Sequence, residues 1–138
     1  MTNYFDNQSD ELGDILKGLI LSINNLKDFK KVDDTIEKVN LGLLKILNLN
    51  IEDITNSPME HFIGIINAEK KLNNHSFDLL AELFFNTAHL LKEQSKKELA
   101  KRLYSRSLLI YQYLLKAEED FTYERHIQIK KLKEILLQ

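Results

Sequence analysis

Hydrophobic side chains recur every three or four positions along most of this chain, which is the spacing of one face of an α-helix. The clearest stretch covers residues 75–117 and is interrupted only by Glu93, Gln94 and Ser95. The pattern therefore predicts two antiparallel helices joined by a tight turn, a helical hairpin. Ser95 and Glu98 have the spacing of a capping box, so we expect them to start the second helix.

A second, weaker hairpin is predicted over residues 9–47, after a flexible arm over residues 1–8. Ser9 can cap its first helix. Gly18 and Gly42 fall inside the predicted helices, where each glycine costs about 1 kcal/mol relative to alanine. Either the two helices cross closely at these glycines, or the fold simply tolerates the cost.

Residues 48–74 interrupt the regular pattern and predict an irregular insert with short helices. Asn50 can cap the first of these helices. Ser57, Pro58 and Glu60 combine a cap, a proline at the first helical position and a capping-box glutamate. We therefore expect a second short helix to start at Ser57.

The last predicted helix covers residues 122–137 and starts at Thr122, a possible cap. Its apolar side would cover the open side of the 75–117 hairpin, while its polar side, with Arg125, would face solvent. An array of helical hairpins needs such a capping helix, because an uncovered hairpin exposes apolar side chains.

The composition favours an all-α fold in a single domain, residues 1–138, because Gly and Pro are scarce and strand-like alternation is rare. The formal net charge of −2 gives no basic field that would attract nucleic acid. The chain lacks Cys, which excludes disulfides and thiolate sites. No apolar run approaches the ~20 residues of a membrane span, and the polar amino terminus is unlike a secretory signal. We expect a cytoplasmic protein without membrane contact.

Small and bulky residues stand at fixed offsets in the 75–117 hairpin: Phe84, Ala88, Leu91, Ala100, Tyr104 and Ser107. Small residues let antiparallel helices approach closely, while aromatic residues fill the space beside them. The arrangement resembles the tetratricopeptide repeat, although Gln112 stands where that pattern usually has proline. The resemblance implies a right-handed array of antiparallel hairpins with a C-terminal capping helix.

The whole chain is also similar to an uncharacterised bacterial family of tetratricopeptide-like helical proteins, a domain of unknown function. The similarity is carried by the leucine-rich residues 43–50, the turn at residues 56–58, and residues 78–83 and 123–125. It implies a fold and offers no activity.

In tetratricopeptide proteins, a concave groove is lined by particular positions of the first helix of each hairpin. The resemblance places five partner-binding residues at these positions: Glu82, Phe85, His89, Lys92 and Glu93. One apolar anchor with several charges can hold an extended or helical peptide. The last helix could instead fill this groove, which would make the same residues structural.

No residue set has a recognisable catalytic or metal-binding spacing. The histidines are never four residues apart, which excludes a helical zinc pair: His61, His75, His89 and His126. The densest basic group is interrupted by Glu98 and is typical of a solvated helix face: Lys96, Lys97, Lys101, Arg102 and Arg106. We expect no metal, no cofactor and no nucleic-acid partner.

These observations favour a non-enzymatic protein–protein interaction or scaffold module, whose pathway the sequence does not identify. One alternative is a homodimer that closes through the apolar surface of residues 108–115. Another is a small-ligand sensor or enzyme with a pocket between the hairpins, because a fold alone does not exclude chemistry.

Overall fold

The computed structural model describes residues 4–25, 32–69, 72–117 and 122–138. These residues form helices, and none of them belongs to a β-strand. The elements are α1 (Tyr4–Asn24), α2 (Val32–Leu47), α3 (Ile51–Asn56), a 3-10 turn (Met59–His61), α4 (Phe62–Glu69), α5 (Asn74–Glu93), α6 (Lys97–Ala117) and α7 (Tyr123–Leu136). The predicted all-α class is therefore confirmed.

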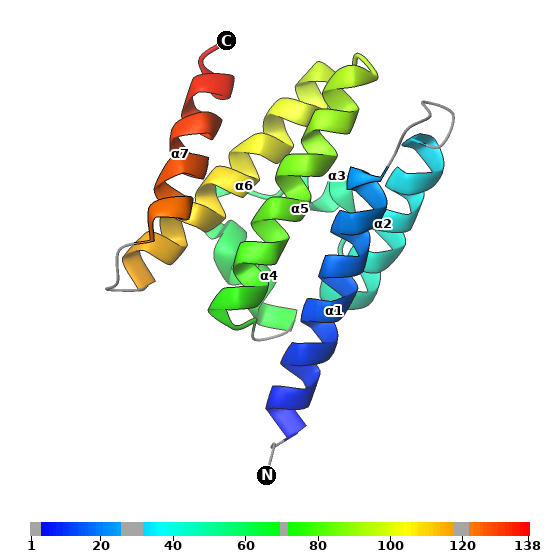
Figure 1. Cartoon of the computed structure of the whole chain (residues 1–138), viewed down its shortest axis with the longest axis vertical. Helices are drawn as coiled ribbons and strands as arrows, with labels where there is room; N and C mark the ends of the chain where they lie inside the picture. The colour runs from blue at the N-terminus through cyan, green and yellow to red at the C-terminus, as the bar shows by residue number, and fades with distance from the viewer. Residues whose placement is uncertain (1–3, 26–31, 70–71, 118–121) are drawn as a thin grey trace.

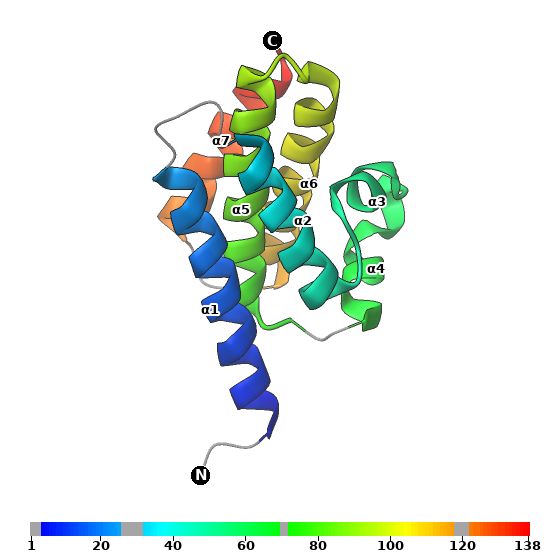
Figure 2. The same ribbon diagram turned by 90° about the vertical axis from the view of Figure 1, so that its right-hand side faces the viewer.

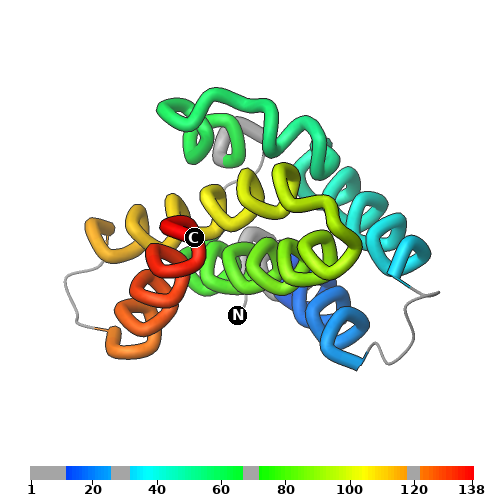
Figure 3. Tube along the Cα trace, turned by 90° about the horizontal axis from the view of Figure 1, so that it is seen from above, coloured from blue at the N-terminus to red at the C-terminus, as the bar shows by residue number. Residues whose placement is uncertain are grey.

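The long helix α5 lies at the centre of the fold, with α6 on one flank and α1 on the other (Figure 1). Helix α7 packs along the outer side of α6, and α2 lies beyond α1. Helices α3 and α4 pack against α6 and form a separate layer, which is clear in Figure 2 and Figure 3. Because α1 packs more extensively on α5 than on α2, it joins the two predicted hairpins into one body.

The α5–α6 hairpin has the close packing that its small residues predict. Ala88 and Ser107 have no exposed surface, and Ala100 is only 1% exposed. The Ser107 hydroxyl donates a hydrogen bond of 2.7 Å to the Ala81 carbonyl, which ties α6 to the backbone of α5. The bulky members of the pattern are also buried: Phe84, Leu91 and Tyr104.

Helix α1 begins at Tyr4, inside the segment where the sequence predicts a flexible arm over residues 1–8. Ser9 therefore lies within the helix and is not its cap, since no glycine or proline interrupts the chain before Gly13. Gly18 and Gly42, the two glycines predicted to raise the cost of the first hairpin, differ in their surroundings. A Cβ atom at Gly42 would lie 2.6 Å from Leu19 Cδ1 in α1, whereas a Cβ atom at Gly18 would meet open space. Close crossing explains Gly42, and tolerance explains Gly18.

Of the two caps predicted for the short helices, the one at Asn50 is confirmed. The Asn50 side chain accepts the Asp53 amide at 2.8 Å, and the Asp53 carboxylate accepts the Asn50 amide at 3.1 Å, a complete capping box. Ser57 was expected to cap the next helix, and this prediction is wrong. Its hydroxyl donates to the Ile54 carbonyl at 2.7 Å and ends α3, because the next helical turn starts only at Met59.

Two further predicted caps lack their side-chain hydrogen bonds. Ser95 has a φ of 64° and ends α5, because the amide of Lys96 folds back to the Leu91 carbonyl at 2.9 Å. The capping box of Ser95 with Glu98 is therefore wrong. Thr122 stands at the predicted position before α7, but its side chain makes no capping hydrogen bond.

Arg125 was expected on the solvent face of α7, and the structure buries it instead. Its Nε atom donates to Asp78 Oδ1 at 2.9 Å, and its Nη2 atom donates to Asp78 Oδ2 at 2.5 Å. The side chain of Arg125 is 7% exposed and that of Asp78 is 33% exposed. This two-pronged ion pair ties the first turn of α7 to the first turns of α5.

Arg106 was also expected to face solvent, and it too is buried, with 4% of its surface exposed. Its guanidinium donates to the carbonyls of Ile54, Thr55 and Ser57 at 3.1, 3.1 and 2.6 Å. It also contacts the Met59 sulfur and lies 5.4 Å above the centre of the Phe62 ring. Arg106 therefore joins the end of α3 and the start of α4 to α6.

Candidate functional site

The five residues predicted to bind a partner lie on one face of α5 and are called the α5 row below: Glu82, Phe85, His89, Lys92 and Glu93. Phe85 is half-buried, and the other four side chains are exposed. The row lies on the side of α5 that meets α6, because the rings of Phe85 and His89 both contact Tyr104. The structure thus brings these five residues together on an accessible face.

Phe85, His89 and Tyr104 form a cluster of three rings. The centroids of Phe85 and His89 are 4.6 Å apart, and those of Phe85 and Tyr104 are 5.7 Å apart, both edge to face. The Tyr104 hydroxyl and His89 Nδ1 lie 2.7 Å apart in a hydrogen bond. This cluster fixes the rotamers in the middle of the α5 row, because each ring has two partners.

The surroundings of the ring cluster keep both polar members uncharged near neutral pH. Partial burial, assisted by the nearby Lys92 ammonium, lowers the pKa of His89, and Glu93 acts in the opposite direction. Burial and the Glu93 carboxylate raise the pKa of Tyr104 to about 12. The hydrogen bond between the two side chains therefore joins a neutral imidazole and a neutral phenol.

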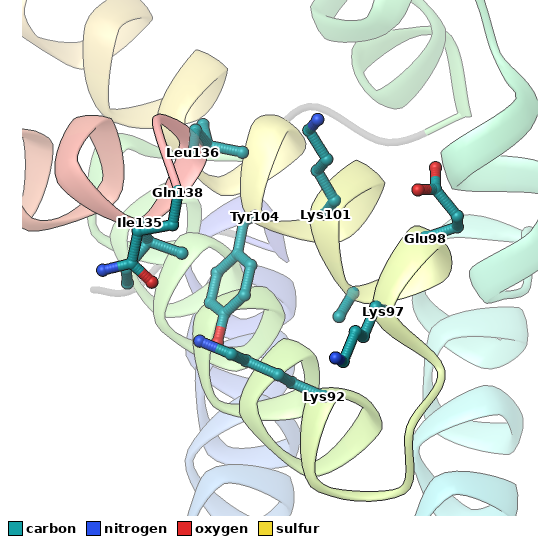
Figure 4. Close-up of a pocket in the computed structure, with 9 residues that line it drawn as sticks. Lys92, Lys97, Glu98, Lys101, Tyr104, Ile135, Leu136 and Gln138 are labelled. Carbon is teal, nitrogen blue, oxygen red and sulfur yellow. The ribbon is translucent and has the colours of Figure 1, made fainter.

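A pocket of about 350 Å³ opens beside the ring cluster and is called the lysine pocket below. Three helices supply its walls: the last turn of α5, the first two turns of α6 and the end of α7, as Figure 4 shows. The lining residues are Lys92, Lys97, Glu98, Ala100, Lys101, Tyr104, Ile135, Leu136 and Gln138. Lys92 extends toward the Tyr104 hydroxyl, so the α5 row and the pocket share an edge (Figure 4).

The pocket exists because α7 leaves α6 at an angle. Helix α7 runs antiparallel to α6, and the ion pair between Arg125 and Asp78 holds its first turn close to α5. Toward its other end α7 diverges from the start of α6 (Figure 1), and residues from both of these helix ends line the pocket. Of the α5 row, Lys92 is among the residues that line this pocket.

The charges around the lysine pocket favour an anion. Three lysines, Lys92, Lys97 and Lys101, and one carboxylate residue, Glu98, are among its lining residues. The start of α6 adds the partial positive charge of a helix amino terminus. Ala100, Ile135 and Leu136 supply an apolar surface beside these charges. This local excess of positive charge contrasts with the formal net charge of −2 of the chain.

Sequence reasoning predicted that the residues of the α5 row share one helix face and did not predict the pocket. Of the pocket residues, only Lys92 belongs to the predicted set, while Lys97 and Lys101 were assigned to a solvated helix face. Their spacing of four residues at the start of a helix was the available signal. The position of Ile135 and Leu136 opposite these lysines depends on the angle of α7, which no local pattern encodes.

Over the described residues, no group of three or more His, Asp or Glu side chains is placed to hold a metal ion. Among the helices of this part of the chain, none is both long and apolar enough to cross a bilayer. In comparisons with known proteins, no family model matches the sequence, and no curated protein or solved structure gives a match. The fold and the comparisons therefore define the class only as far as an all-helical protein.

Proposed function

We propose that this protein is a non-enzymatic interaction module with a tetratricopeptide-like arrangement, in which α7 acts as the capping helix and the α5 row binds a segment of a partner protein. The observation that carries the proposal is the α5 row itself. It presents a half-buried aromatic ring between exposed charges of both signs on the central, best-packed helix. Rigid support lowers the entropy lost on binding, which favours recognition.

The chemistry of the α5 row specifies the kind of segment it can hold. Phe85 offers the exposed part of its ring as an apolar anchor, and its contacts with His89 and Tyr104 fix its position. Glu82 and Glu93 lie toward opposite ends of the row and can pair with basic side chains of the partner. We therefore expect a short segment with an apolar or aromatic residue between two basic residues.

The experiment captures partners from a lysate on the immobilised full chain and quantifies them for four variants. Phe85→Ala and His89→Asp change the centre of the row, and Glu82→Lys changes its edge. Glu37→Lys, an exposed charge reversal on α2, is the matched control. Central residues of an interface carry most of its energy, so we expect Phe85→Ala and His89→Asp to reduce capture at least about tenfold.

The helix content of each variant is measured by circular dichroism, so that unfolding is not mistaken for loss of binding. Capture that is unchanged in both central variants, with helicity intact, would eliminate the α5 row as the recognition site. Capture that falls equally in the Glu37→Lys control would show non-specific charge attraction instead of recognition.

A homodimer is the second candidate function, on a different surface from the one the sequence suggests. Residues 108–115 are buried or half-buried against the core, so they do not offer a free apolar face. Leu41 and Leu44 of α2 are instead 62% and 41% exposed and lie three residues apart on one side of the helix. Sedimentation at micromolar concentration tests this candidate, since Leu41→Glu with Leu44→Glu should convert any dimer to monomer.

A further inference from the structure

The lysine pocket combines an apolar surface with a cationic one. A protein segment bound on the α5 row would not require both. One wall is apolar and comes from Leu136 and Ile135 at the end of α7 and Ala100 on α6. Cationic side chains also line the pocket, among them Lys97 and Lys101 on α6. The two surfaces lie within one opening of about 350 Å³, which is near the lower limit of the roughly 300–1,000 Å³ that small-molecule sites occupy.

We propose that this pocket binds a small organic anion, a carboxylate or phosphate monoester that carries a short apolar chain. The anionic head would be held by the long, exposed side chains of Lys92, Lys97 and Lys101, whose ammonium groups form charge-assisted hydrogen bonds to carboxylate or phosphate oxygens. The chain would lie against Ile135 and Leu136. This site is additional to the proposed partner-binding face and shares only Lys92 with it.

The sign of the charge decides the class of ligand. Lys97, Lys101 and Lys92 outnumber the single carboxylate of the lining, Glu98. A cation would therefore meet a net repulsion, and an uncharged apolar molecule would leave the lysine rim without partners. Inorganic phosphate or acetate would satisfy the rim and leave the apolar wall open to water, so an amphiphilic anion uses more of the site.

The angle of α7 allows the pocket to accept such a ligand without rearrangement of the core. The ion pair of Arg125 with Asp78 fixes one end of α7, while the half-buried Ile135 and Leu136 lie near its other end. A ligand that contacts both α6 and this end of α7 would hold the two helices together. Binding should therefore stabilise the fold in proportion to ligand concentration.

The test uses the full chain with four probes, measured by calorimetry and by amide chemical shifts. Octanoate and octyl phosphate carry both parts of the proposed ligand and distinguish its two possible heads. Acetate carries the head alone, and octyltrimethylammonium carries the chain with the opposite charge. We expect saturable binding of at least one octyl anion, at least about tenfold weaker binding of acetate, and none of the cation.

Paired variants locate the site. Lys97→Gln with Lys101→Gln should lower the affinity for the octyl anion at least about tenfold, because two of the three cationic partners are lost. Lys130→Gln with Lys131→Gln removes the same charge from exposed positions of α7 outside the pocket and should leave affinity within about twofold. Leu136→Asn tests the apolar wall and should also weaken binding.

The proposal is overturned if neither octyl anion binds, if the cation binds as well as the anions, or if both double variants weaken binding equally. Lys92 is left unchanged in all variants, so that the α5 row stays intact. If the wild-type chain binds neither octyl anion but captures its partner normally, the result counts against the pocket alone, whereas the Phe85→Ala result tests the α5 row alone.

Discussion

Replacement of Arg106 by Met removes the group that holds the α3–α4 layer against α6, while it keeps a flexible apolar side chain beside Phe62. Three carbonyls lose a charged donor: those of Ile54, Thr55 and Ser57. The Ile54 carbonyl keeps a second donor, the Ser57 hydroxyl, so the loss is concentrated on the other two.

The size of the effect follows from those two carbonyls. A hydrogen bond to a charged group contributes about 1.5–3 kcal/mol, so two of them amount to about 4 kcal/mol. The apolar contact that the methionine keeps with Phe62 offsets about 1 kcal/mol of this, which leaves an expected loss of about 3 kcal/mol. Arg106→Lys should lie between wild type and Arg106→Met, because one ammonium cannot reach three carbonyls in the geometry of a guanidinium.

Urea unfolding followed by circular dichroism measures this loss. With a typical slope of about 1–3 kcal/mol/M, the midpoint should fall by roughly 1–3 M. Arg102→Met is the matched control, because Arg102 is exposed on the same helix and makes one long hydrogen bond, 3.3 Å, to Asn56. That control should stay within about 0.5 kcal/mol of wild type. A loss below about 1 kcal/mol for Arg106→Met would refute the assignment of Arg106 as the anchor of this layer.

Three further changes test other parts of the structure by stability or titration. Gly18→Ala should raise the free energy of unfolding by up to about 1 kcal/mol, because its Cβ meets open space, whereas Gly42→Ala should gain less or lose stability; equal gains in urea unfolding would contradict the close crossing. Arg125→Met should cost about 2 kcal/mol and speed amide exchange in α7, because it leaves a partly buried carboxylate of α5 unpaired; unchanged exchange would contradict its anchoring role. The imidazole of His89, followed by NMR, should titrate below its ordinary pKa of 6.5, and Lys92→Gln should move the pKa upward. The folded state favours neutral His89, so the stability that this residue contributes is present above pH 6.5 and is lost as pH falls through the lowered pKa. An ordinary pKa for His89, unchanged in Lys92→Gln, would contradict this prediction.

The sequence by itself determined the helices and the main hairpin. Periodic apolar residues specify which face of a helix is buried, and they correctly place Ala88, Ala100 and Ser107 between α5 and α6. The capping box of Asn50 was equally predictable, because both partners lie within one helical turn. Periodicity and capping are local properties, which is why they can be inferred without knowledge of the fold.

Only the tertiary structure decided which charged residues are buried and what shape the site has. The burial of Arg106 and Arg125 depends on carbonyls and a carboxylate supplied by distant elements. The lysine pocket likewise depends on the angle between α7 and α6, which is set by packing and by one ion pair. A charge that is buried against a distant partner leaves no periodic signal along the chain. Its burial can therefore be seen only in the three-dimensional contacts.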